Sequence, residues 1–251
     1  MNRIVTPQSA RQALDGTVSR LVQEFTARPL APREACDRGL AKLRTARHGT
    51  LAIIQDLTQE ESDFFPGTLL PSGKSWSIGQ VVQHLILIEG FYRGHMQNLI
   101  ELGRKGASKK NLELTFREID NSIAFVPKAV ISKLAAPLNL LNMFIPQAIR
   151  EEIFRTPVIP GINPSAGEPV LSRPIAELRT EAEASLRATE AMFSGYLPPD
   201  LLERTFSHPL LGANNVADVL GILAAHEQRH HGQIRRVFAD PHFPPRPKNA
   251  I

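Results

Sequence analysis

Histidines at helical spacing are the residues of this chain whose pattern points most directly to chemistry. His226 and His230 stand four residues apart in the segment VADVLGILAAHEQRHHGQIRRVF. A spacing of four places two side chains on one face of a helix, on successive turns. Both also continue a stripe of apolar residues that we expect to face a core, where an imidazole without a partner would cost about 1–3 kcal/mol. A metal ion bound by both imidazoles would remove that cost.

A third candidate ligand lies on an earlier helical segment. His84 stands beside a stripe of apolar residues at three- and four-residue steps, so we expect it to face the same interior as the other two. His95 follows eleven residues later, which is about 16 Å along a helix axis, and it cannot share a site with His84. The other histidines have no partner at ligand spacing, and we expect His231 to lie at the rim of the site. These other histidines are His48, His208, His231 and His242.

The same segment also fits H-E-x-x-H, a signature of zinc proteases in which the glutamate is the general base. The extended form of that signature has a glycine and a histidine where this chain has Gln233 and Arg236, and no glutamate follows Glu227 as a third ligand. The zinc proteases also use a sheet edge, and the sequence shows no clear strand pattern. We therefore do not favour a protease, and we interpret Glu227 either as a proton carrier or as a solvent-facing residue.

The elements that must position these histidines are helices. Apolar residues recur at three- and four-residue steps, and Ser77 with Gln80 forms a capping-box pair at the start of the segment that carries His84. Between the two histidine-bearing regions, residues 104–172 lose this regularity and contain many prolines, with short helices expected within 116–134 and 138–154. The pattern predicts long helices over 7–27, 35–57, 77–103, 174–196 and 215–238.

These elements predict an all-α fold. We expect a four-helix bundle with an extra N-terminal helix and a long crossover insertion between the second and third bundle helices. In this interpretation residues 1–34 form an N-terminal helical extension, 35–240 the bundle and 241–251 a Pro-rich tail. Long irregular connections are more often functional than idle, so we expect the crossover, residues 104–172, to cover the mouth of the metal site and to select the substrate.

Composition excludes several classes of protein. The 251 residues are 42% hydrophobic, which excludes wholesale disorder. A net charge of +4 is too small to indicate nucleic-acid binding, and the single cysteine, Cys36, excludes a cysteine metal cluster within the chain. No run reaches the roughly 20 apolar residues of a membrane span. The N-terminal residues lack an apolar signal segment, so we expect a cytoplasmic protein without a membrane partner.

Two stretches resemble the DinB superfamily. Trp76 precedes a His-Leu pair at His84 by eight residues, and H-P-L-L-G at 208–212 leads into AAHEQRHHGQ. These are similar to the patterns of the second and fourth helices of that superfamily, and the resemblance covers about residues 35–238. It implies a four-helix bundle that binds a metal ion through three histidines, which fall on His84, His226 and His230.

The resemblance also implies an activity. Three neutral imidazoles on a zinc, nickel or ferrous ion leave a coordination position open for a thiol or water. Relatives in the superfamily use low-molecular-weight thiols of bacteria, such as bacillithiol or mycothiol. The leading hypothesis is therefore a metal-dependent thiol S-transferase that acts on a small-molecule substrate. The alternatives are a metal-dependent hydrolase and a non-catalytic, stress-related metal-binding bundle, and a homodimer is left open.

Overall fold

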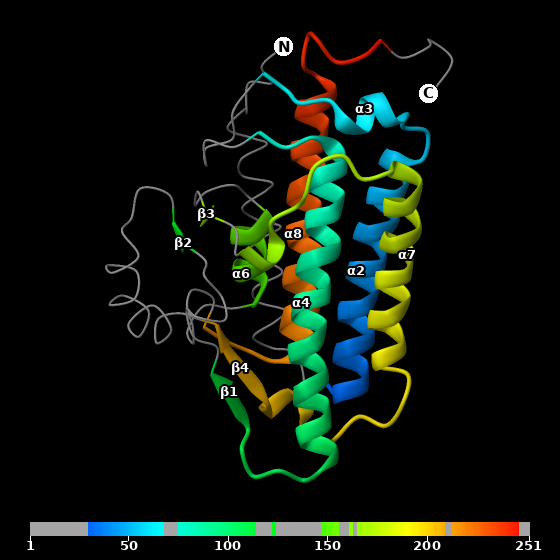
Figure 1. Ribbon diagram of the computed structural model, residues 1–251. Coiled ribbons are helices and arrows are strands. Elements are labelled where there is room, and N and C mark those ends of the chain that lie inside the picture. Colours follow the sequence, from blue (N-terminus) through cyan, green and yellow to red (C-terminus); the bar gives the residue numbers. More distant parts are fainter. Residues whose placement is uncertain are drawn as a thin grey trace, which may run out of the picture.

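A computed structural model describes residues 30–67, 75–113, 122–123, 147–155, 161–162, 165–208 and 212–245. Four long helices lie side by side (Figure 1), namely α2 (Pro32–Ile54), α4 (Ile78–Arg104), α7 (Ile175–Met192) and α8 (Val216–Phe238). They confirm the expected all-α bundle. The expected helix over 7–27 lies outside the described residues, as does the end of the tail. Of residues 116–134, where we expect a short helix, the structure describes only 122–123, which form a strand. No helix in the described ranges combines the length and apolar character that crossing a membrane requires.

Capping residues fix where the two histidine-bearing helices begin. The Ser77 hydroxyl accepts a hydrogen bond from the backbone N–H of Gln80, and the Gln80 side chain accepts one from the backbone N–H of Ser77. Asn215 and Asp218 form the same reciprocal pair at the start of α8. Such a cap contributes about 1 kcal/mol and sets the first residue of the helix. The caps therefore help to fix which residues of α4 and α8 face the interior.

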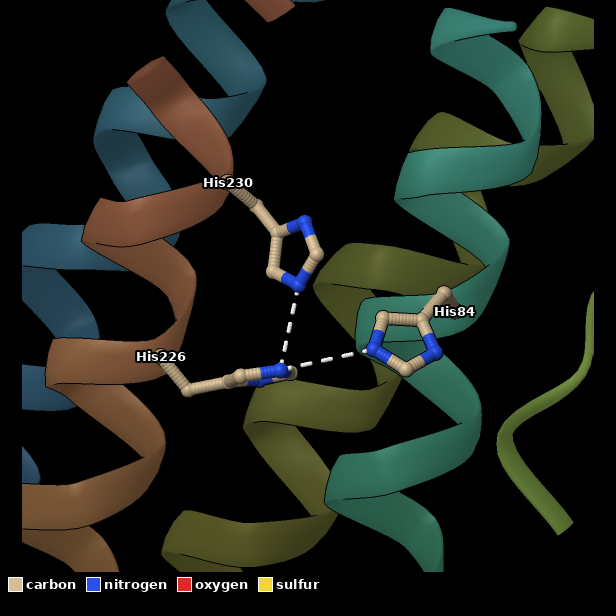
Figure 2. A group of neighbouring side chains, drawn as sticks. All are labelled: His84, His226 and His230. Atoms are coloured by element: carbon tan, nitrogen blue, oxygen red, sulfur yellow. Dashed lines mark hydrogen bonds between the residues drawn. The ribbon is translucent and has the colours of Figure 1, made fainter. Parts of the chain in front are cut away.

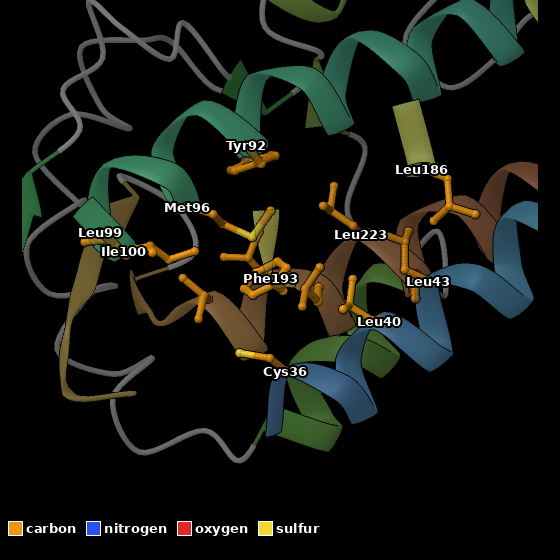
Figure 3. Close-up of a cluster of buried hydrophobic side chains, with 14 of the residues drawn as sticks. Cys36, Leu40, Leu43, Tyr92, Met96, Leu99, Ile100, Leu186, Phe193 and Leu223 are labelled. Atoms are coloured by element: carbon orange, nitrogen blue, oxygen red, sulfur yellow. The ribbon is translucent and has the colours of Figure 1, made fainter. Parts of the chain in front are cut away.

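Apolar side chains pack between the four helices in two clusters. The larger cluster surrounds Tyr92, Met96 and Phe193 (Figure 3), and the smaller one surrounds Trp76 and Ile78. On α8 the smaller cluster includes Ile234 and Val237, and the larger one includes Val216, Val219, Leu220, Leu223 and Ala224. The turns between them carry polar side chains from all four helices, which we call the polar layer. It comprises Arg47, Thr50, His84, Glu89, Ser185, Thr189, His226, Glu227, His230 and His231, and all but half-buried His226 are buried.

Short elements complete the described fold. They include the helices α3 (Gln59–Asp63) and α6 (Gln147–Arg155) and the 3-10 turns η1 (Ser165–Gly167) and η2 (Leu201–Glu203). The strand β4 (Thr205–His208) pairs in parallel with β1 (Asn111–Glu113) and antiparallel with β5 (Gly212–Asn214). A second antiparallel pair joins β2 (Ser122–Ile123) to β3 (Gly161–Ile162). The expectation of a chain without strands was wrong in this detail, because strands of two to four residues are too short for an alternating pattern to show.

The crossover packs onto the bundle through polar contacts as well as apolar ones. In α6, both carboxylate oxygens of Glu151 lie 2.8 Å from the Lys42 ammonium of α2. A β-carbon added to Gly221 of α8 would lie 2.2 Å from a Glu151 oxygen, so the absence of a side chain at Gly221 lets α6 approach closely. The turn η1 lies against α4. The crossover therefore contacts α4 and α8, the two helices that carry the candidate ligands, and their neighbour α2.

Candidate metal centre

Three imidazoles converge within the polar layer. His84 comes from α4, and His226 and His230 come from successive turns of α8 (Figure 2). The Nε2 atom of His226 lies 3.4 Å from Nε2 of His84 and 3.1 Å from Nε2 of His230. One ring nitrogen from each histidine lies within 4.8 Å of the other two. The structure thus brings together the three histidines that the sequence singles out, in an arrangement compatible with binding a metal ion.

In His84 and His230, the group that lies next to Nδ1 shows which ring nitrogen carries the proton. Nδ1 of His84 lies 2.6 Å from the carbonyl oxygen of Gly167, and Nδ1 of His230 lies 2.8 Å from Oε1 of Gln233. An oxygen of this kind only accepts, so each Nδ1 donates its proton and each Nε2 keeps a lone pair. The Nε2 lone pairs of His84 and His230 are then both available next to Nε2 of His226. A cation placed there would satisfy them, so the donor set fits a metal ion.

Burial keeps the three imidazoles neutral. It lowers the pKa of His84 to about 4, against a partial opposing effect of the Gly167 carbonyl. Burial likewise holds the pKa of His226 and of His230 well below the usual range. Repulsion between protonated rings, and the positive charge of Arg229, lower both pKa values further. Neutral imidazole is the form that binds a metal ion. The three side chains are therefore ready to act as ligands at neutral pH.

Two groups that orient the ligands were not identified from the sequence. Gly167 lies in the irregular crossover, where no spacing marks it. A β-carbon on Gly167 would lie 2.6 Å from Cδ1 of Ile88 and 3.2 Å from Cε1 of His84, so only glycine fits here without a shift. Next to it, the backbone N–H of Val170 donates to Oε1 of Gln83 at 2.9 Å, which fixes the segment against α4. Gln233 did have a signal, since it follows His230 by three residues on one helix.

Glu227 is part of a buried ion pair. Arg47 of α2 donates from Nε to one carboxylate oxygen at 2.8 Å and from Nη2 to the other at 3.2 Å, and the Thr50 hydroxyl also donates to the carboxylate. The side chains of Arg47 and Glu227 are 1% and 2% exposed. The interpretation of Glu227 as solvent-facing was therefore wrong. Its oxygens are engaged by α2, which leaves neither free for the general-base role that the H-E-x-x-H signature requires.

Two further histidines lie apart from the convergent three. His231 is buried, with Nε2 2.9 Å from the Thr50 hydroxyl, so the expected rim position was wrong. His95 contacts the rings of Phe91 and Phe206, at centroid distances of 4.7 and 5.7 Å.

The other histidines flagged from the sequence lie elsewhere. His48 and His242 are exposed. His208 ends β4, and its side chain lies outside the described part of the structure. None of these side chains joins the three imidazoles within the described residues.

Comparison with known proteins identifies the family. No curated protein and no solved structure matches the chain. The family model of the DinB superfamily matches residues 42–234, a span that covers the bundle from α2 to α8 and includes all three histidines. The helical bundle and the three-histidine cluster both agree with that match. The chain therefore belongs to the DinB superfamily.

Proposed function

We propose that His84, His226 and His230 bind one divalent metal ion, and that the protein is a metal-dependent S-transferase for a low-molecular-weight thiol. The observation that carries the proposal is the convergence of three Nε2 atoms, two of them on rings whose Nδ1–H is already bonded. Zinc, nickel and ferrous ions all suit imidazole ligands. The thiol is inferred from the resemblance to DinB-superfamily transferases, and a small molecule is the second substrate. We place the activity in the cytoplasm and leave a homodimer open.

The chain's own residues would prepare the site for this chemistry. A metal ion held by three neutral imidazoles keeps a coordination position open and lowers the pKa of a thiol or water that binds there. Gly167 and Gln233 fix the ring orientations of His84 and His230. The Trp76 ring, 5% exposed and 4.9 Å from the His84 ring, restricts water on that side. An activated thiolate could then attack an electrophilic carbon of the second substrate and displace its leaving group.

A cobalt-substituted protein tests the thiol. We expect a low-molecular-weight thiol to produce an intense sulfur-to-cobalt charge-transfer band, which imidazole and water do not produce. The thiol must lose its proton to bind, so its affinity should rise with pH up to the pKa of the free thiol, about 8.5 for a cysteine-like group. Turnover with a model electrophile should follow the same pH dependence and vanish in His226→Ala.

A cobalt spectrum that no thiol changes at any pH would contradict the transferase. Hydrolysis of a model ester by the metal-loaded protein would then point to water as the nucleophile at the same site. The absence of both activities would leave a metal-binding bundle without catalysis.

Gly167→Ala should weaken metal binding about 10–100-fold, the usual cost of losing a group that orients a ligand. The added methyl group would meet Ile88 and force the segment away from His84, so that Nδ1 loses its acceptor. Trp76 is the single tryptophan of the chain, and quenching of its fluorescence by bound cobalt measures the affinity. Gly94→Ala on α4 is the control, because a β-carbon there meets nothing within 4 Å. Equal affinity in both variants would contradict a role for Gly167.

A further inference from the structure

Arg229 is a half-buried cation beside the three histidines. It lies on α8, three residues after His226 and one before His230, and residues three apart on a helix are neighbours. The positive charge of Arg229 lowers the pKa of each of the three convergent histidines, which agrees with its position on α8 between His226 and His230. In the part of the chain that the structure describes, Arg229 forms no hydrogen bond and no ion pair.

Other arginines that are buried or half-buried in the described ranges do have acceptors. Arg47 pairs with two carboxylates, and Arg204 pairs with Asp200 and two backbone carbonyls. Carbonyl, hydroxyl or carboxylate oxygens likewise accept from Arg93, Arg150, Arg173 and Arg179. Arg229 therefore differs from these buried and half-buried arginines of the described ranges, because it has no acceptor there.

The charges around Arg229 do not compensate it. Burial lowers the pKa of Arg229, and the positive charge of Arg236 lowers it further. No acidic side chain is among the groups that act on His226 and His230. The one acidic group that acts on His84 is Glu168, which is exposed and lies on the crossover. No guanidinium nitrogen of Arg229 is among the fully buried atoms without a partner, so the group stays accessible to a ligand. A guanidinium is the side-chain group best suited to bind a planar oxyanion through two parallel hydrogen bonds.

We propose that Arg229 binds a carboxylate of the small-molecule ligand at the metal centre, so that the preferred thiol is one that carries a carboxylate. This inference rests on the proposed function, because it takes the sulfur to be bound at the metal ion. The two ends of the ligand would then be held at once, one by the metal and the other by Arg229. Holding both ends fixes the orientation of the sulfur toward the second substrate.

Two thiols of similar length isolate the contribution of the carboxylate. The cobalt-loaded protein is titrated with 3-mercaptopropionate and with 2-mercaptoethanol, and the ratio of their dissociation constants is compared between the wild type and Arg229→Gln. The comparison cancels the different pKa values of the thiols. We expect the wild type to favour 3-mercaptopropionate, and Arg229→Gln to reduce that preference about tenfold, which corresponds to about 1.4 kcal/mol. Arg235→Gln is the matched control, because Arg235 is exposed on the same helix and its loss changes the net charge equally.

The outcomes separate this inference from the proposed function. An unchanged ratio in Arg229→Gln, with both thiols still giving the sulfur band, overturns the role of Arg229 and leaves the thiol site intact. If neither thiol gives a band, the transferase is overturned, and propionate then tests Arg229 alone. A cobalt spectrum that propionate shifts more strongly in the wild type than in Arg229→Gln supports the anion site, and an equal or absent shift overturns it.

Discussion

His230→Ala is expected to abolish metal binding, from one ion per chain to none. The variant leaves only two of the three convergent imidazoles, and Gln233 loses the Nδ1–H that it accepts. Loss of a group that merely orients a ligand costs about 10–100-fold in affinity, and the loss of the ligand itself must cost more. Elemental analysis of protein purified without chelators gives the occupancy, and fluorescence of Trp76 during cobalt titration gives the affinity.

His95→Ala is the matched control for this experiment. His95 lies on the same helix as His84 but contacts the rings of Phe91 and Phe206, in the direction of the larger apolar cluster. Its replacement removes an imidazole of the same size without touching the three convergent rings. Full metal occupancy in His230→Ala, in protein with unchanged helical content, would overturn the assignment of the ligands.

The convergence of the three histidines follows from information that is local in the sequence. His226 and His230 share a helix face by spacing alone, and the capping pairs at Ser77 and Asn215 locate the starts of α4 and α8. Because four helices with one apolar stripe each have few ways to pack, stripes that carry histidines must meet in the interior. The bounds of α4 and α8, and the approach of His84 to the other two histidines, could therefore be predicted without any long-range contact.

The contacts that orient and support the site are long-range, and no local pattern reveals them. Gly167 reaches His84 across 83 residues of chain, and Arg47 reaches Glu227 across 180. Local sequence alone predicts a turn for a glycine in a Pro-rich segment. It predicts a catalytic base for the glutamate of H-E-x-x-H. Which neighbour each residue meets depends on how the crossover and α2 pack against the other helices. The pairing of the short strands is also long-range, since Asn111 of β1 pairs with Thr205 of β4.

The polar layer joins all four helices at the level of the metal centre. Arg47 of α2 contacts the carboxylates of Glu227 on α8, at 2.8 Å, and Glu89 on α4, at 3.0 Å. Ser185 and Thr189 of α7 donate their hydroxyl protons to Glu89. Burial by itself would lower the pKa of Arg47, but the two carboxylates outweigh it and raise the pKa above its usual value. A single guanidinium thus pairs with carboxylates from two other helices, and it sets the position of α8 next to His226.

Arg47→Met is therefore expected to lower the free energy of unfolding by about 3–5 kcal/mol, the cost of leaving buried charge without its partner. Arg44→Met provides a control of matched geometry. Arg44 lies one turn earlier on α2 and pairs with Glu190 at 2.7 Å, but its side chain is 49% exposed against 1% for Arg47. A solvated pair of this kind contributes about 0–1 kcal/mol. Urea unfolding of both variants, with unchanged slopes, gives the two losses directly. Similar losses of unfolding free energy in the two variants would mean that water reaches the polar layer and that Glu227 is not fixed there. A much larger loss in Arg47→Met would support Glu227 as the group that holds the ligand-bearing turn of α8 in place.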